Sequence, residues 1–313
     1  MEAVLQWGLD LIRSIQTIAN PALNSVMKAV TQLGSANAYL IMIPLVYWCI
    51  DERKGLRLGL TILVSAWANV SLKFLFSQPR PFFPAYDPSV DICMIREPYG
   101  GFPSGHAQSS LVLWTIAASW FKKKYIYFIA ALICLVVSFS RVYLGMHFPT
   151  DILGGWLIGG VVLCGFFLLG PIIEKLLIKG GYRAWIIAAA AMSFIMILYR
   201  PAKDILLAGG MMLGIGAGYT LNSKYVGFSG SAIFSESKSN GAKFLILAAR
   251  FIIGMAILQA VVILGSKFGP QEDSSVFELF YFIKYAVAAL WVGVGAPWVF
   301  TKLRLAKSGT VQA

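Results

Sequence analysis

The sequence predicts an all-α protein, a polytopic transmembrane helical bundle of about nine spans preceded by interfacial amphipathic helices. Hydrophobic residues make up 58% of the 313 residues and charged residues only 13%, which is too apolar for a soluble globular protein. Long apolar runs recur along the chain, and Lys and Arg gather in the loops between them. Both features are typical of membrane-embedded helices.

Residues 1–35 carry two stretches with apolar residues at helical spacing. The first ends at Pro21, and the second runs from Leu23 to Gly34. We expect two amphipathic helices that lie in the membrane interface, and the alternative is that they pack against the bundle. Residues 1–20 lack a basic segment followed by a small-residue cleavage site, so we expect no removable signal peptide.

Nine apolar runs follow and define the expected spans. They cover residues 36–50, 56–76, 106–121, 125–142, 150–172, 184–199, 202–221, 244–266 and 279–301. Several are shorter than the ~20 residues that an untilted span requires, so their ends are approximate. Residues 225–241 are rich in Ser and Gly, and we expect them to form a linker-like loop.

Five clusters of Lys and Arg lie in alternate loops between these spans. They are Arg53, Lys54 and Arg57; Lys122, Lys123 and Lys124; Lys175, Lys179 and Arg183; Lys224, Lys238 and Lys243; and Lys302, Arg304 and Lys307. Positive loops stay in the cytoplasm, so we expect an outside N-terminus and a cytoplasmic C-terminus in the cell (inner) membrane. The same bias explains the formal charge of +12, and no basic stripe with interleaved aromatics indicates nucleic-acid binding.

Three short polar segments interrupt the apolar runs, at residues 73–81, 103–106 and 140–151. The only two histidines of the chain, His106 and His147, both fall inside them. The loop orientation places all three segments on the periplasmic, or extracytoplasmic, face. Together they supply three cations, a carboxylate and a Gly-bounded serine, which are the groups needed to hold a phosphate and attack its phosphorus.

His147 is the candidate nucleophile. Pro149 fits the first turn of the following helix, which brings Asp151 into that turn and within reach of the imidazole. A carboxylate on one ring nitrogen leaves the other free to attack and stabilises the positive charge that forms. The alternative is that Asp151 only caps the helix N-terminus, where acidic residues are favoured anyway.

Ser104, Gly105 and His106 precede the third span, and a helix N-terminus at this point would favour a bound anion. Gly105 has no Cβ to obstruct a close approach of the backbone to a ligand. His106 is placed to protonate a leaving oxygen and later to activate water. The alternative is an ordinary loop-to-helix start with a structural histidine.

Lys73, Arg80 and Arg141 are the cations of the polar segments. Each alone could be a residue whose charged end reaches the membrane interface. Gathered together they would repel one another unless a multiply charged anion shared the site, and the fork of arginine suits phosphate oxygens. We expect no metal and no other cofactor, because the segments hold no carboxylate cluster and the cysteines, Cys49, Cys93, Cys134 and Cys164, show no ligand or disulfide spacing.

The three segments resemble the signature of the type 2 phosphatidic acid phosphatase superfamily, Lys-x6-Arg-Pro, Pro-Ser-Gly-His and Ser-Arg-x5-His-x3-Asp, and fill every position of it between residues 73 and 151. The resemblance implies that Lys73, Arg80, Ser104, Gly105 and Arg141 bind phosphate. It implies that His147 forms a phosphohistidine, that Asp151 orients it and that His106 acts as acid and then as base. Residues 1–35 would then be N-terminal interfacial helices, 36–174 the catalytic transmembrane core, and 175–313 additional transmembrane helices.

Four functions remain open on the sequence. We expect a metal-independent phosphatase of lipid phosphomonoesters such as phosphatidate, lysophosphatidate or a sphingoid phosphate. Its partners would be the lipid phosphate substrate and the surrounding membrane lipids, and it could form a homo-oligomer. Aromatic residues near the site, at positions 82, 83, 86 and 99, would suit lipid headgroup depth. The alternatives are an isoprenyl (undecaprenyl) pyrophosphate phosphatase, a sugar-phosphate phosphatase, and a non-catalytic transporter or binder of lipid phosphates that uses Gln259 and Lys284 of the last spans.

Overall fold

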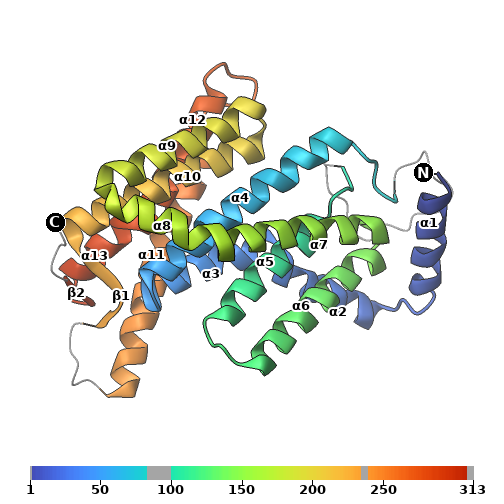
Figure 1. The fold of residues 1–313 in the computed structure, drawn as a ribbon, viewed down its shortest axis with the longest axis horizontal. Coiled ribbons are helices and arrows are strands. Elements are labelled where there is room, and N and C mark those ends of the chain that lie inside the picture. The colour runs from blue at the N-terminus through green and yellow to red at the C-terminus, as the bar shows by residue number, and fades with distance from the viewer. Residues whose placement is uncertain (1, 83–99, 234–238, 309–313) are drawn as a thin grey trace. The chain divides into compact units, whose positions relative to one another are not determined.

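The computed structural model describes residues 2–82, 100–233 and 239–308, and nearly all of its elements are helices (Figure 1). The helices are α1 Glu2–Gln16, α2 Pro21–Thr31, α3 Ala36–Cys49, α4 Glu52–Phe76, α5 Gly105–Ser119, α6 Lys124–Tyr143, α7 Pro149–Cys164, α8 Gly170–Lys179, α9 Gly181–Tyr199, α10 Lys203–Leu221, α11 Asn240–Phe268, α12 Phe277–Leu290 and α13 Ala296–Lys302. Short turns, η1 Gln32–Gly34, η2 Gly165–Leu169, η3 Asn222–Val226 and η4 Trp291–Gly295, join or extend them. The strands are β1 Phe228–Ile233 and β2 Ala306–Ser308.

Seven helices or helix series among the described residues are long and apolar enough to cross a membrane. They are Glu52–Phe76, Lys124–Tyr143, Pro149–Lys179, Gly181–Tyr199, Lys203–Val226, Asn240–Phe268 and Phe277–Lys302. A bent pair, Pro21–Gly34 with Ala36–Cys49, passes the same test only when its two helices are taken together. The protein is therefore an integral multi-pass membrane protein.

The expected count of nine spans is not confirmed. All nine apolar runs coincide with helices, but α3 has 14 residues and α5 has 15. At 1.5 Å per residue such helices reach only about 22 Å, less than the hydrocarbon thickness of about 30 Å. Hydropathy registers an apolar run without showing whether lipid or protein surrounds it, and α5 is packed against α6 and α7.

The chain divides into two compact units. The first comprises residues 1–39 and 68–168, and the second comprises residues 40–67 and 169–313. All three polar segments belong to the first unit. The division into 1–35, 36–174 and 175–313 that the sequence suggests stays a prediction.

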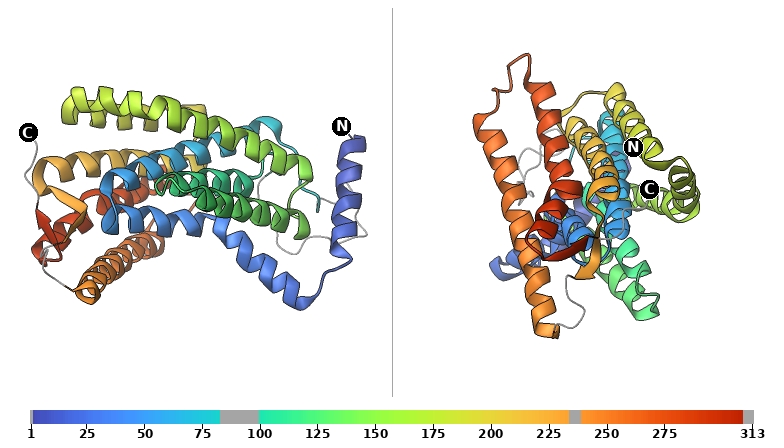
Figure 2. Two further views of the ribbon diagram at one scale, coloured as in Figure 1. Left: turned by 60° about the horizontal axis from the view of Figure 1, so that its bottom comes forward. Right: turned by 90° about the vertical axis from the view of Figure 1, so that its left-hand side faces the viewer.

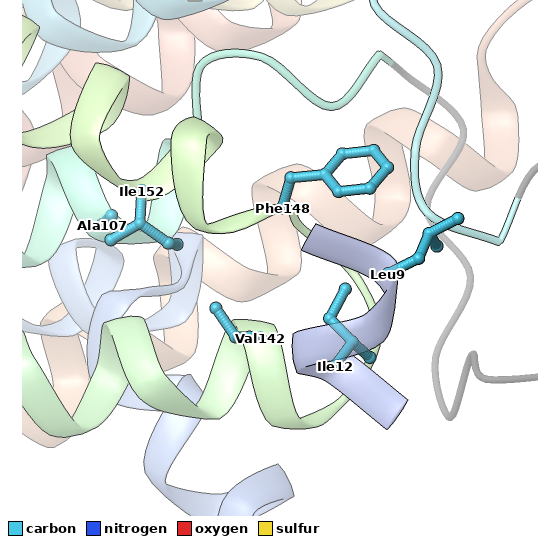
Figure 3. Packing of buried hydrophobic residues seen from close by; sticks show 6 residues of the cluster. All are labelled: Leu9, Ile12, Ala107, Val142, Phe148 and Ile152. Carbon is cyan, nitrogen blue, oxygen red and sulfur yellow. The ribbon is translucent and has the colours of Figure 1, made fainter. Parts of the chain in front are cut away.

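In the first unit, α1 packs against the helices that carry the polar segments. Leu9 and Ile12 are buried in one cluster with Ala107, Val142, Phe148 and Ile152 (Figure 3). The two α1 residues face Phe148, which directly follows His147 in the chain. This is the packed arrangement that the sequence left as the alternative, and an interfacial position of α1 is not confirmed.

The second N-terminal helix, α2, lies along α6. Its residues Leu23 and Met27 pack against the buried cluster of Tyr143, Leu144 and Met146. The hydroxyl of Tyr143 also donates to Asn24 Oδ1 at 2.6 Å. An apolar helix face is the same sequence signal whether lipid or protein covers it. Here protein covers part of the apolar face of each N-terminal helix, while Val4, Trp7 and Val26 stay exposed.

The second unit contains α10 packed against α9 and α12, and a two-stranded antiparallel sheet (Figures 1 and 2). Strand β1 lies inside the stretch 225–241 that the sequence suggests to be a linker, so that part of the expectation is wrong. The buried side chain of Arg250 explains the order there, since it donates to backbone oxygens of Trp48, Gly230, Ala232 and Leu305. These bonds join α3, β1 and the segment before β2 to α11.

Helix α7 approaches its neighbours closely through glycines. A Cβ added at Gly154 would overlap the ring of Phe102, and one at Gly155 would lie 2.6 Å from the carbonyl oxygen of Ser104. These contacts hold the first turns of α7, with Asp151, against the segment that carries Ser104. Gly160 on the same helix has nothing within 4 Å of an added Cβ.

We predict that Gly154→Ala lowers the unfolding temperature, because the new methyl group overlaps Phe102 and overpacking costs about 1–3 kcal/mol. Gly160→Ala is the matched control, and it should be neutral or stabilising by up to about 1 kcal/mol, since Ala favours a helix over Gly. Thermal unfolding of both variants in the same detergent checks this. Equal melting temperatures for the two variants would contradict the packing described for α7.

Candidate active site

Four helix ends of the first unit meet at one place. Helix α4 ends at Phe76 and is followed by Gln78 and Arg80, and α6 ends just after Arg141. Helices α5 and α7 begin there, with Ser104 before α5 and Asp151 in the first turn of α7. Hydrogen bonds cross between all three polar segments, from Gln78 to Asp151, from Ser104 N to Asp151 O and from Arg80 to His147.

His147 and Asp151 form a fully buried pair. The ring nitrogen Nδ1 lies 3.1 Å from Asp151 Oδ2, and the two side chains are 1% and 0% exposed. The same Oδ2 accepts the backbone N–H of Phe148 at 3.0 Å, which caps α7. Both interpretations of Asp151 from the sequence therefore apply at once, since one carboxylate caps the helix and contacts the imidazole.

The other oxygen of Asp151 is held by Gln78. The side-chain amide of Gln78 donates to Asp151 Oδ1 at 2.8 Å. The sequence predicts no role for this residue, although it lies in the first polar segment. Its position between a helix end and Arg80 was the available signal, but the partner is 73 residues away and no local pattern indicates it.

The contacts of the imidazole determine which ring nitrogen of His147 carries the proton. Arg80 Nη1 lies 3.2 Å from His147 Nε2 and also donates to Met146 O at 3.0 Å. Arginine has no acceptor atom, so Nε2 accepts and carries the lone pair. The proton is then on Nδ1, from which it is donated to Asp151.

The electrostatic surroundings keep this imidazole neutral. Burial lowers the pKa of His147 well below its usual value of 6.5, and the neighbouring cations, Arg80 first, lower it further. The ring thus remains neutral at pH values at which an exposed histidine is already half protonated. A neutral ring with its lone pair on Nε2 is the form that can attack phosphorus.

His106 differs from His147 in exposure and in its contacts. It is half-buried at the start of α5, and its Nε2 lies 3.4 Å from Arg141 Nη1. Arg141 is 1% exposed, and the same Nη1 donates to the hydroxyl of Thr31 at 3.2 Å. The more accessible histidine is therefore the one expected to exchange protons with the leaving group and water.

Ser104 is buried and caps α5. Its Oγ accepts the N–H of Ala107 at 3.5 Å, and its own backbone N–H donates to Asp151 O at 2.9 Å. The backbone N–H of Ser104 is thus engaged with protein and does not contribute to an anion site at the start of α5. The hydroxyl hydrogen is the group that Ser104 can offer to a phosphate.

The missing Cβ of Gly105 leaves room for a buried side-chain amide. A Cβ there would lie 3.1 Å from Asn69 Oδ1. Asn69 is buried on α4 and donates to Gln108 Oε1 at 2.8 Å and to Pro103 O at 3.3 Å. Gly105 thus admits the amide that joins α4 to α5, and this contact positions the start of α5.

Lys73 lies in the last turn of α4 and is half-buried. Its Nζ donates to Gly100 O at 2.7 Å and to Gly101 O at 3.4 Å. Gly101 in turn adjoins the carboxylate, because a Cβ there would lie 3.0 Å from Asp151 Oδ2. The structure therefore brings all of the predicted site residues into one neighbourhood.

Other residues singled out in the sequence lie elsewhere. In the second unit, Gln259 is exposed, and Lys284 is buried and donates to Ser266 Oγ at 3.1 Å. Phe82 is half-buried, while Phe83, Tyr86, Cys93 and Tyr99 fall outside the described residues. Within the described part of the chain, no group of three or more His, Cys, Asp or Glu side chains could hold a metal ion.

Comparisons with known proteins identify the family. Residues 54–172 match the family model of the PAP2 superfamily. Residues 206–308 match a second family model, described as "PAP2 superfamily phosphatase, transmembrane extension". Phosphatidylglycerophosphatase B of Bacillus subtilis is 31% identical over 51% of this chain and 79% of that protein. Undecaprenyl-diphosphatase of Sulfolobus acidocaldarius is 26% identical over 50% and 76%, and glucose-6-phosphatase 3 of Mus musculus is 24% identical over 96% of each.

The matched stretch 54–172 contains the three polar segments and the four helix ends that position them. A second match covers much of the second unit. The relative at 31% identity is matched over more than two thirds of its length. The chain therefore belongs to the PAP2 superfamily.

Proposed function

We propose that this protein is a metal-independent membrane phosphatase that hydrolyses lipid phosphomonoesters through a phosphohistidine at His147. The observation that carries the proposal is the pair of contacts on that imidazole. Asp151 accepts from Nδ1, and Arg80 lies at Nε2, so the attacking atom faces a cation that can hold the phosphate oxygens.

In the first step, the lone pair on His147 Nε2 attacks phosphorus and the bond to the leaving oxygen breaks. Lys73, Arg80 and Arg141 stabilise the phosphoryl oxygens, with the hydroxyl of Ser104 beside them. His106 starts this step as the imidazolium, gives one of its two N–H protons to the leaving oxygen and becomes neutral, and an alcohol is released. The positive charge that develops on the imidazole of His147 is stabilised by Asp151, to which Nδ1–H is already bonded.

In the second step, a water molecule attacks the phosphorus of the phosphohistidine. His106, which lost its proton in the first step, accepts a proton from this water. The P–N bond breaks, its electron pair returns to Nε2, and inorganic phosphate is released. Both histidines then regain their starting protonation states, so the cycle needs no external oxidant, reductant or cofactor.

A lipid substrate is supported by the surroundings of the site. Lys73 is followed by Leu75 and Phe76, which are exposed at the end of a membrane-spanning helix. An acyl chain can lie along such an apolar surface while its phosphate reaches the cations. Phosphatidylglycerophosphatase B, one of the relatives, is also named for a lipid substrate.

A soluble sugar phosphate is the second candidate. Glucose-6-phosphatase 3 is matched over 96% of its length and of this chain, whereas the lipid phosphatase is matched over 51% of this chain. An isoprenyl pyrophosphate is the third, since undecaprenyl-diphosphatase is also a relative. The same cations would serve all three phosphate groups, so the discrimination must come from the part of the substrate beyond the phosphate.

A substrate panel tests the proposal. The purified protein is incubated with phosphatidate, lysophosphatidate, sphingosine phosphate, undecaprenyl pyrophosphate and glucose 6-phosphate, with excess EDTA, and phosphate release is measured. We predict the highest kcat/KM for one of the lipid monophosphates and an unchanged rate with EDTA. A higher kcat/KM for glucose 6-phosphate or the pyrophosphate would select that alternative, and activity restored only by added magnesium would contradict metal independence.

Variants of the two histidines should differ in turnover and in phosphoenzyme formation. His147→Ala should abolish turnover and any trapped phosphoenzyme, because the attacking atom is gone. His106→Ala should lose about 10²–10⁴-fold in activity on lipid phosphates, the usual contribution of general acid catalysis. It should still be phosphorylated by p-nitrophenyl phosphate, whose leaving group needs no proton, and phosphoenzyme should accumulate because the base for water is missing.

Acid quenching and quantification of the phosphoenzyme check this prediction, with wild-type protein in parallel. Equal losses of His106→Ala on both substrates, without a trapped intermediate, would assign His106 to phosphate binding and not to proton transfer. Retained turnover in His147→Ala would refute the covalent intermediate altogether.

We further propose that the site faces the extracytoplasmic side of the cell membrane, with the N-terminus outside and the C-terminus in the cytoplasm. The alternation of positive loops supports this orientation. In a background without the native cysteines, Ser77→Cys beside the site should react with an impermeant thiol reagent in intact cells. Lys123→Cys, in the loop between α5 and α6, should react only after the cells are opened, and the reverse pattern would invert the proposed topology.

A further inference from the structure

We infer that Thr31, in the N-terminal segment that precedes the matched stretch 54–172, is a positioning residue that orients Arg141 for phosphate and for His106. This inference rests on the proposed function. Thr31 closes α2, and its side chain is 1% exposed. It lies 110 residues from Arg141 in the sequence, yet its hydroxyl oxygen accepts from Arg141 Nη1 at 3.2 Å.

One guanidinium nitrogen serves two partners. Arg141 Nη1 lies 3.2 Å from Thr31 Oγ1 and 3.4 Å from His106 Nε2. A terminal nitrogen of arginine carries two hydrogens, and both lie in the plane of the guanidinium group. Fixing one of them on the hydroxyl of Thr31 therefore fixes the direction of the other toward the imidazole of His106.

Thr31 is itself held by contacts on both sides along the chain. Before it, Asn24 accepts the hydroxyl of Tyr143, and Gln16 Nε2 donates to Tyr143 O at 2.8 Å. These bonds fasten α1 and α2 to the last residues of α6, two positions after Arg141. The hydroxyl of Thr31 and the guanidinium of Arg141 thus sit on elements that are fixed to each other.

After Thr31, the turn η1 packs against α5 and α6. A Cβ at Gly34 would lie 2.9 Å from His106 O and 2.7 Å from Val137 Cγ1. The indole of Trp114 on α5 donates to Leu33 O at 3.0 Å. The N-terminal segment thereby contacts the backbone of His106 as well as the side chain of Arg141, and so joins the proposed acid to the proposed phosphate ligand.

The consequence is a preorganised arginine. Without the Thr31 hydroxyl, the guanidinium group can turn about its last bonds, and it must be ordered when phosphate binds. A hydrogen bond to a charged group contributes roughly 1.5–3 kcal/mol, so losing it should reduce kcat/KM about tenfold to hundredfold. Vanadate, which imitates five-coordinate phosphorus, should bind more weakly by a similar factor, because it relies on the same oriented arginine.

The experiment compares two pairs of proteins that differ mainly in the hydroxyl group. Wild type and Thr31→Val form the first pair, because valine replaces the hydroxyl of threonine by a methyl group. Thr31→Ala against Thr31→Ser is a second pair with the methyl group absent from both, and it decides the question if Thr31→Val does not fold. Each variant is measured for kcat and KM on the best substrate of the panel, for the inhibition constant of vanadate and for its melting temperature.

We expect Thr31→Val and Thr31→Ala to lose about tenfold or more in kcat/KM and in vanadate affinity, with Thr31→Ser within about threefold of wild type. Thr17→Val is the control, because that exposed hydroxyl bonds only within its own helix end, to Ser14 O at 2.7 Å. It should leave all constants unchanged.

Four outcomes would overturn the inference. Activity that follows the methyl group, with Thr31→Ser worse than Thr31→Val, would assign Thr31 to packing. A lower melting temperature with unchanged kinetic constants would assign it to stability alone. Wild-type protein that releases no phosphate from any substrate would remove the proposed function and the inference with it, whereas active wild type with all Thr31 variants equal to it would refute the inference only.

Discussion

The carboxylate of Asp151 is the interaction on which the site depends. Its side chain is fully buried, and a buried charge is costly unless hydrogen bonds compensate for the lost water. Gln78 from the first polar segment, His147 and the backbone of Phe148 donate to its oxygens, and its own carbonyl accepts from Ser104 of the second segment. One residue therefore ties together three segments that are far apart in the sequence.

The cations arranged around this carboxylate suit a ligand with several negative charges. Arg80 donates to a carbonyl oxygen and contacts one imidazole, and Arg141 donates to a hydroxyl and contacts the other. The carbonyl oxygen and the hydroxyl oxygen that accept these hydrogen bonds are neutral groups. A phosphate group that enters between them would relieve their mutual repulsion, and the proposed chemistry uses this attraction to favour the transition state.

Close packing of the helices fixes the positions of the residues that make these polar contacts. Gly154 and Gly155 let α7 approach Phe102 and Ser104, and Gly105 lets α5 approach Asn69. On the other side, α1 covers Phe148, next to His147 (Figure 3). The buried His147 thus lies between a closely packed helix pair and the N-terminal helices.

The sequence by itself determined the helical membrane fold and the groups that the site contains, because long apolar runs and rare polar residues at fixed spacing leave few alternatives. It could not determine the number of spans or the surroundings of α1 and α2, since lipid and protein cover an apolar face equally well. It also missed Gln78 and Thr31, which are ordinary polar residues until folding brings them 2.8 Å from Asp151 and 3.2 Å from Arg141. Only the tertiary structure decides such long-range partners, because a hydrogen bond depends on distance in space and not on position along the chain.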